Sequence, residues 1–239
     1  MILDAFVSRH GDAFSFTRQH SCNFAKKIAG DFNPIHDVDA KRFCVPGDLL
    51  FSYLLTRYGV SQQLNCQFSG MVSADVLLHC ELSEGQIQVC DEQGRVYLTV
   101  QFSGEHTHDI GVIEPLFQDY VQFSGQNFPH ILQPLMEQQG VMIHPLRPLV
   151  IYESMALSFT TLPTSKVELS LASSKLDIEG KRGNVTLNFI LTANGVQIGK
   201  GEKKMILSNL QPYDATEMQR MVDEYNNRKT SAGCGNFDL

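Results

Sequence analysis

The segment from Gly47 to about Gln62 constrains the fold most, because apolar residues occupy nearly all of its faces. Its large apolar residues are Leu49, Leu50, Phe51, Tyr53, Leu54, Leu55 and Tyr58. A helix that is apolar nearly all round should be buried on most of its sides. Another part of the chain must therefore wrap around this helix.

Four strand patterns follow the apolar segment and are separated by turns that contain Gly. They cover about residues 64–69, 74–82, 86–90 and 95–103. One helix followed by an antiparallel meander of four strands predicts an α+β unit, in which a curved sheet wraps round a central helix.

The same order of elements recurs, more loosely, in the second half of the chain. A shorter helix is predicted from Phe128 to Gln139, with Pro129 in its first turn and a kink or an end at Pro134. The four strand patterns that follow cover about residues 149–160, 166–177, 184–193 and 196–207. This weak repetition predicts two units in tandem.

The predicted boundaries follow from breaks in these patterns. Residues 104–120 show no clean period, so we expect a first unit over 1–110 and a second over 115–226. A closing helix is predicted to end near Tyr225. Residues 227–239 are rich in Asn, Gly and Ser and are predicted to form a disordered tail.

The candidate site lies just before the apolar segment, in the sequence GDFNPIH over residues 30–36. A helix is predicted to break at Gly30, and Asn33 is predicted to cap a short new helix that starts at Pro34. Asp31 then lies in the break and His36 in the first turn of the new helix. A carboxylate and an imidazole held close together can move protons to and from a water or a substrate. The alternative is a solvated turn in which Asp31 only caps the chain.

This string, together with the helix that Gly47 opens, resembles the signature of MaoC-like (R)-specific enoyl-CoA hydratases over residues 17–60. Those are hotdog-fold enzymes that add water to trans-2-enoyl thioesters. The whole chain also resembles a bacterial family, related to these hydratases, that has no assigned function. The resemblance implies a tandem (double) hotdog whose two units form an intramolecular pseudo-dimer, and a homodimer of whole chains is left open.

The resemblance also implies roles for four residues of this chain. Asp31 and His36 would activate one water, and Asn33 would order the turn. The backbone N–H of Gly47 would donate to the thioester oxygen as negative charge develops there.

This chain departs from the family in three places. Pro46 stands where the family has a His, and the span 37–46 that helps to shape the acyl pocket is short. Asp48 brings a negative charge close to the place where an enolate would form, unless it points away or caps the helix.

The leading hypothesis is a hydratase or dehydratase that converts trans-2-enoyl-CoA to (R)-3-hydroxyacyl-CoA, with coenzyme A or acyl carrier protein as the carrier. Two alternatives stay open. One is a non-catalytic hotdog protein that binds an acyl thioester or a protein partner, and the other is an acyl-CoA thioesterase. Whether the chain is an enzyme is therefore open, with a hydratase-like lyase favoured.

Composition and residue spacing argue against several other classes of protein. The net charge of −7 argues against a nucleic-acid surface. The six cysteines form no CxxC pair, and the two imidazoles of His106 and His108 would need further ligands, so we predict no metal and no cofactor. No apolar window is long enough to span a membrane, and the cytoplasm is the expected location.

Overall fold

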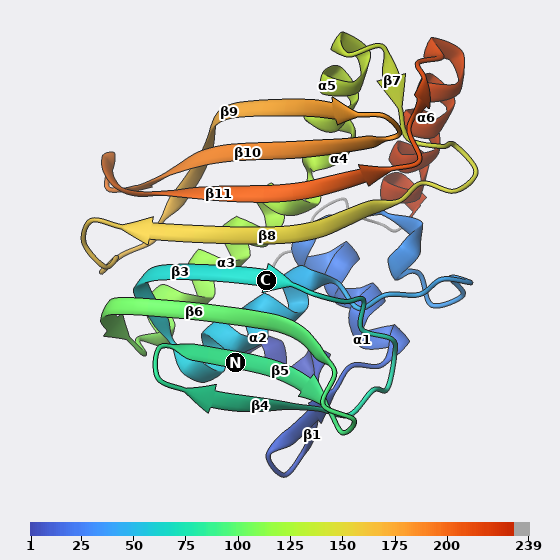
Figure 1. Cartoon of the computed structure of the whole chain (residues 1–239). Coiled ribbons are helices and arrows are strands. Elements are labelled where there is room, and N and C mark those ends of the chain that lie inside the picture. Colours follow the sequence, from blue (N-terminus) through green and yellow to red (C-terminus); the bar gives the residue numbers. More distant parts are fainter. Residues whose placement is uncertain (232–239) are drawn as a thin grey trace.

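The computed structural model describes residues 1–231, and its centre is a sheet of ten strands that runs through both halves of the chain (Figure 1). The strand order is β1-β2-β4-β5-β6-β3-β8-β11-β10-β9. Every neighbouring pair in this sheet is antiparallel. A short pair, β7 (Val141–Met142) and β12 (Gln211–Pro212), lies apart from it.

The first half supplies six strands and the helix that they enclose. The strands are β1 (Ser8–His10), β2 (Ala13–Ser15), β3 (Val60–Phe68), β4 (Leu78–Ser83), β5 (Gln86–Asp91) and β6 (Val96–Thr107). The enclosed helix is α2 (Gly47–Tyr58), which has buried residues on all sides of its middle turns. It ends before Gly59, earlier than predicted, and β3 starts at once.

A second layer of short helices covers the outer side of α2. It consists of η1 (Ile2–Phe6), α1 (Arg18–Asn23), η2 (Phe24–Ala29) and η3 (Pro34–His36). Thr17 caps α1 by accepting from the backbone N–H of His20. Gly30 ends η2, as the sequence predicts.

The second half repeats the strand order of the first. Its strands are β8 (Val150–Phe159), β9 (Glu168–Glu179), β10 (Arg182–Ala193) and β11 (Val196–Ser208). The orders β3-β6-β5-β4 and β8-β11-β10-β9 match. Strand β3 pairs with β8, and this pairing is the seam between the two units. The fold is therefore a tandem hotdog of class α+β, with one sheet continuous across its two units.

The helix layer of the second unit differs from the prediction. Residues 104–120 are not irregular, because β6 continues to Thr107 and α3 runs over Ile110–Gly125. The predicted helix 128–139 is divided at Ile131 into α4 (Asn127–His130), which contains extended backbone at Phe128, and α5 (Leu132–Gln138).

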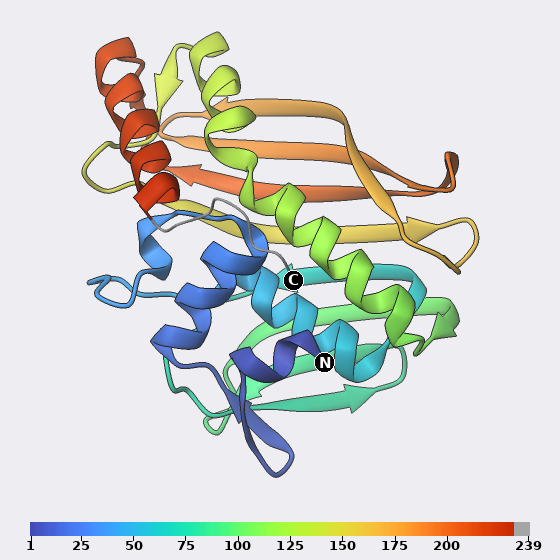
Figure 2. The ribbon, with the colours of Figure 1, turned by 180° about the vertical axis from the view of Figure 1, so that it is seen from behind.

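The helix α3 lies along the seam of the two units (Figure 2). It packs against η2 and α2 of the first unit and against β9 of the second. The division into 1–110 and 115–226 consequently stays a proposal, since α3 belongs to the packing of both units.

The prediction of a disordered tail from residue 227 is wrong for its first residues. The helix α6 (Ala215–Ser231) continues through them, and residues 232–239 lie outside the described part of the chain.

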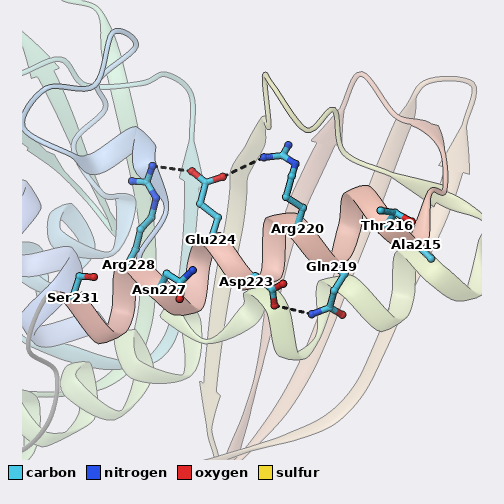
Figure 3. Close-up of a pocket in the computed structure, with 9 residues that line it drawn as sticks. All are labelled: Ala215, Thr216, Gln219, Arg220, Asp223, Glu224, Asn227, Arg228 and Ser231. Carbon is cyan, nitrogen blue, oxygen red and sulfur yellow. Dashed lines mark hydrogen bonds and ion pairs between the residues drawn. The ribbon is translucent and has the colours of Figure 1, made fainter.

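On one face of α6, Glu224 forms ion pairs with Arg220 and Arg228 (Figure 3). Such pairs support an exposed helix. Among the described residues, no helix is long and apolar enough to cross a membrane.

Candidate functional site

The loop that carries the candidate site begins where η2 ends. Gly30 has a φ of 65°, in the left-handed region, and the N–H of Asp31 donates to the carbonyl of Ala25 at 2.8 Å. The chain therefore turns sharply away from the helix axis. Asn33 restarts it by accepting from the N–H of Ile35 with its side-chain oxygen at 3.2 Å. The left-handed backbone of Gly30 and the cap by Asn33 together place Asp31 and His36 on either side of one turn.

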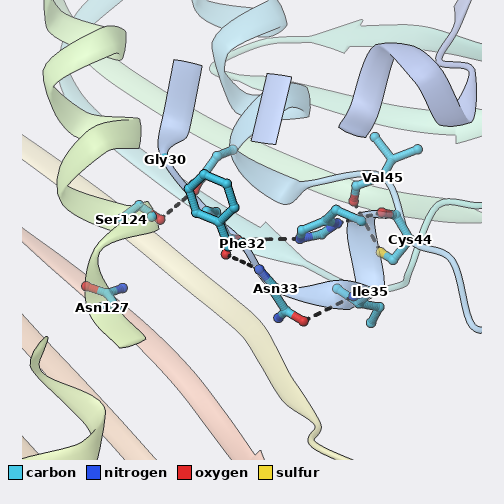
Figure 4. Close-up of polar contacts among 12 residues, drawn as sticks. Gly30, Phe32, Asn33, Ile35, Cys44, Val45, Ser124 and Asn127 are labelled. Carbon is cyan, nitrogen blue, oxygen red and sulfur yellow. Dashed lines mark hydrogen bonds and ion pairs between the residues drawn. The ribbon is translucent and has the colours of Figure 1, made fainter. Parts of the chain in front are cut away.

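Asp31 and His36 face each other across this turn, with Asp31 Oδ2 and His36 Nε2 3.7 Å apart. The second oxygen of Asp31 accepts from the backbone N–H of Asn33 at 2.9 Å. His36 Nδ1 lies 2.7 Å from the carbonyl oxygen of Cys44. Figure 4 shows this set of contacts around the turn. Both side chains are thus oriented by backbone groups of the first unit.

The Cys44 carbonyl decides which nitrogen of His36 carries a proton. A carbonyl only accepts, so Nδ1 must donate, and in the neutral imidazole Nε2 is then an acceptor. In that tautomer, Nε2 and Asp31 Oδ2 are two acceptors that lie 3.7 Å apart. A water molecule that contacts both can donate one hydrogen to each.

The pair lies on the wall of a cavity of about 620 Å³ between the two units. This volume falls within the range of small-molecule binding sites. Polar side chains that line it include Asp31, His36, Asp48, Ser124, Asn127 and Lys203, and Arg220, Glu224 and Arg228 of α6 line it as well. Apolar lining comes from both units and includes Phe68, Phe128, Leu132, Ile143, Tyr152 and Met205. The cavity can accordingly take a ligand with a polar centre and an apolar chain.

Gly47, the predicted oxyanion donor, is the first residue of α2 and lines the same cavity. A Cβ at this position would lie 3.0 Å from the rings of Phe68 and Tyr152. The residue is therefore packed tightly against both units, and the positive end of the α2 dipole lies at the cavity wall.

Asp48 neither caps α2 nor points away from the cavity, which are the two possibilities named from the sequence. Its Oδ2 accepts from the hydroxyl of Ser124 at 2.5 Å, and the ammonium of Lys203 donates to that hydroxyl. Burial raises the pKa of Asp48, and the charge of Lys203 and the Ser124 hydrogen bond oppose this. Lys203 supplies the positive charge that balances Asp48.

Lys203, Ser124 and Asn127 belong to the second unit and were not predicted from the sequence. Of these three residues, only Lys203 could have been singled out from the sequence pattern. It occupies the inward-facing series of β11, in which Gly201, Met205 and Leu207 are its buried neighbours. A lysine at the inward position of an alternating strand is unusual.

Two polar atoms beside the cavity have no hydrogen-bond partner among the described residues. They are Oδ1 of Asp48 and Oδ1 of Asn127. Buried polar atoms are normally paired, so both are places where a ligand or water would bond. Ser124 and Asn127 face the turn that carries Asn33 (Figure 4).

The helix α6 closes one side of the cavity. The hydroxyl of Tyr225 lies 3.1 Å from the carbonyl oxygen of Gly125 and 3.3 Å from that of Gly30. Arg228 binds Asp37 in the loop that follows η3. The last helix thus holds the candidate-site loop against α3.

The two imidazoles of His106 and His108 lie far along the chain from this site. Their Nε2 atoms are 3.1 Å apart, and His106 Nδ1 bonds to Ser61 at 2.8 Å. Among residues 1–231, no group of three His, Cys, Asp or Glu side chains is placed to hold a metal ion.

A family model matches residues 1–216 of the chain, and its description is "Protein of unknown function (DUF3581)". The chain belongs to this family. No curated protein matches its sequence.

Several solved structures are similar to this DUF3581 protein in overall shape. One is the tesB protein MAP1729c of Mycobacterium avium subs paratuberculosis, with 8% identity and a TM-score of 0.48, covering 84% of this chain and 95% of that one. Another is a putative thioesterase II from Thermobifida fusca YX, with 9% identity and a TM-score of 0.47, covering 86% and 97%. A MaoC-like dehydratase has 9% identity and a TM-score of 0.43, covering 85% and 98%.

Similarities this low carry no argument about activity. The specific resemblance to MaoC-like hydratases therefore stays a prediction, and the function must be argued from the site itself.

Proposed function

We propose that this protein is a hydratase or dehydratase of acyl thioesters, which interconverts trans-2-enoyl and 3-hydroxyacyl thioesters. The observation that most supports this is the pairing of Asp31 and His36. Their acceptor atoms lie 3.7 Å apart at the wall of a cavity that can take an acyl chain. The carrier would be coenzyme A or acyl carrier protein.

In the proposed reaction, a water bound by Asp31 Oδ2 and His36 Nε2 attacks the β-carbon of the enoyl thioester. The new C–O bond forms as one proton of the water passes to His36 Nε2. The electron pair of the double bond moves toward the thioester carbonyl, whose oxygen gains negative charge. The α-carbon then takes the proton from the pair on the same face, which restores the neutral imidazole and completes the addition of one water.

The geometry supports this chemistry in two further ways. The Cys44 carbonyl holds the imidazole in the tautomer that accepts a proton at Nε2. Gly47 lies on the cavity wall at the amino end of α2, where a backbone N–H and the helix dipole would favour negative charge on the carbonyl oxygen.

The test uses crotonyl-CoA and longer trans-2-enoyl-CoAs and follows the loss of the conjugated thioester absorbance. Asp31→Asn and His36→Ala should each lower the rate by about 10²- to 10⁴-fold, the scale of a positioned proton-transfer group. Because both residues act on one water, the double variant should be little slower than either single variant. Asp39→Asn is the matched control, since Asp39 is an exposed carboxylate of the same loop.

The same samples separate the alternatives. Release of free thiol without loss of the double bond would identify a thioesterase. A rise in melting temperature with acyl-CoA, without turnover at any chain length, would identify a binding protein. Turnover that survives both substitutions would contradict the assigned roles of Asp31 and His36.

A further inference from the structure

Lys203 is buried in the wall of the same cavity, with 4% of its surface exposed. Lysine is almost never buried this deeply unless its charge is compensated. The neighbouring Lys204 points to the other face of β11 and pairs with Glu202 there. The inward position of Lys203 therefore places an ammonium in the cavity at the cost of removing it from water.

Its surroundings hold the ammonium in one position. Nζ donates to Ser124, which in turn donates to Asp48, so a serine lies between the cation and its counter-charge. Nζ also lies 4.3 Å from the centre of the Tyr152 ring. These contacts come from α2, α3 and β8, and they leave the ammonium with donor capacity, because an ammonium has three N–H groups.

The position of Lys203 complements that of the Asp31–His36 pair. The pair belongs to the first unit and Lys203 to the second, and all three line one cavity. The negative charge of Asp31 also acts on Lys203, and it opposes the effect of burial, which lowers the pKa of the lysine. A ligand in the cavity would therefore meet proton-accepting atoms from one unit and the Lys203 ammonium from the other.

We propose that Lys203 is a catalytic residue that stabilises the negative charge on the thioester oxygen of the substrate, together with the amino end of α2. This inference rests on the proposed function. It assigns to Lys203 the positive charge that offsets the negative charge of Asp48. It also predicts a ligand class, because a site built for an enolate should bind 3-ketoacyl thioesters in their enolate form.

A purely structural lysine would neutralise Asp48 and have no effect on the ligand. A lysine that contacts the thioester oxygen would change the ionisation of a bound β-ketothioester. Preorganised donors at a developing oxyanion are commonly worth about 10²- to 10³-fold each in rate. The two roles therefore differ in a quantity that can be measured without any turnover.

The experiment measures the enolate fraction of acetoacetyl-CoA, from its enolate absorbance at a fixed pH, when bound to the full-length protein. The wild-type protein should raise the ratio of enolate to keto form about 10- to 10²-fold over that in buffer. Lys203→Met should remove most of this increase. Lys204→Met, which removes the same charge from the outer face of the strand, should leave it unchanged.

Because Lys203→Met leaves Asp48 without its counter-charge, the double variant Asp48→Asn/Lys203→Met is measured as well. It removes both charges and should fold while still lacking the increase. An unchanged enolate ratio in either Lys203 variant, or no increase with the wild-type protein, overturns the proposal. Hydration that proceeds normally in Lys203→Met would overturn it while leaving the proposed function intact. Enolate binding that depends on Lys203, without any hydration, would support the proposed role of Lys203 and contradict the proposed hydratase function.

Discussion

Arg228 binds the carboxylate of Asp37, with Nη1 and Oδ2 2.6 Å apart. Lys26, from η2, approaches the other oxygen of the same carboxylate at 2.7 Å. Asp37 directly follows His36 in the chain. The last described helix and the helix before the candidate site therefore meet at a residue next to the proposed base.

The first prediction is that Arg228→Ala destabilises the protein although it lies near the end of the chain. The Asp37 side chain is 15% exposed, so its charge is only partly screened by water. We expect a loss of about 1 kcal/mol, the upper end for such pairs, and a melting temperature lower by about 2–4 °C. Lys229→Ala, at an exposed position of the same turn, should cause no measurable change. Equal melting temperatures for the two variants would mean that the Arg228–Asp37 pair does not stabilise the protein.

The position of α3 shows where sequence reasoning failed on the fold. Its buried face repeats with a clear helical period, through Val112, Ile113, Leu116, Phe117, Tyr120 and Val121. Gly111 and Pro115 interrupt the first turns and suggested an irregular segment. Pro115 is accommodated within the helix, because tertiary packing on both units stabilises it more than the missing hydrogen bond destabilises it.

The second prediction concerns Gly125, where α3 meets the site loop. A Cβ at Gly125 would overlap the carbonyl oxygen of Ala29 and lie 3.1 Å from the backbone nitrogen of Asp31. Gly125→Ala should therefore cost about 1–3 kcal/mol, measured by denaturant unfolding, and displace Asp31. Any hydration rate should fall with it.

The control for Gly125 lies in the same helix. A Cβ at Gly111 would contact only the Asp109 side chain, at 3.2 Å. Gly111→Ala should therefore be neutral or slightly stabilising, because Ala is the better helix former. Equal stability for the two variants would show that α3 can move away from Ala29 at little cost.

The candidate site could be predicted only in part, for a physical reason. Asp31, Asn33 and His36 lie within one turn, and local backbone signals bring them together. Lys203 and Ser124 approach Asp48 only because β11 and α3 pack across the seam. No local pattern encodes a contact between residues so distant in the sequence. The sequence alone therefore does not reveal that Lys203 is the counter-charge of Asp48.

The last prediction is a pH dependence of stability that arises at Asp91, the last residue of β5, just before the turn to β6. Its Oδ1 accepts from the backbone N–H groups of Gln93 and Arg95 at 3.0 Å, and its Oδ2 accepts from the hydroxyl of Tyr97 at 2.8 Å. The hydrogen bond from the Arg95 N–H is the main reason that the pKa of Asp91 is lowered from its ordinary value of 3.8. These bonds favour the ionised carboxylate in the folded state.

Because the folded-state pKa lies below the unfolded one, Asp91 adds stability above about pH 4, and this is lost as the pH falls through the folded-state value. Asp91→Asn should therefore have the lower melting temperature at neutral pH, and the difference should shrink in acid as the wild-type carboxylate takes up a proton. Glu92→Gln, at the exposed neighbouring position, should follow the wild type throughout. Melting curves from neutral pH to about pH 3 measure this, and a difference that stays constant would show that these hydrogen bonds do not favour the ionised form.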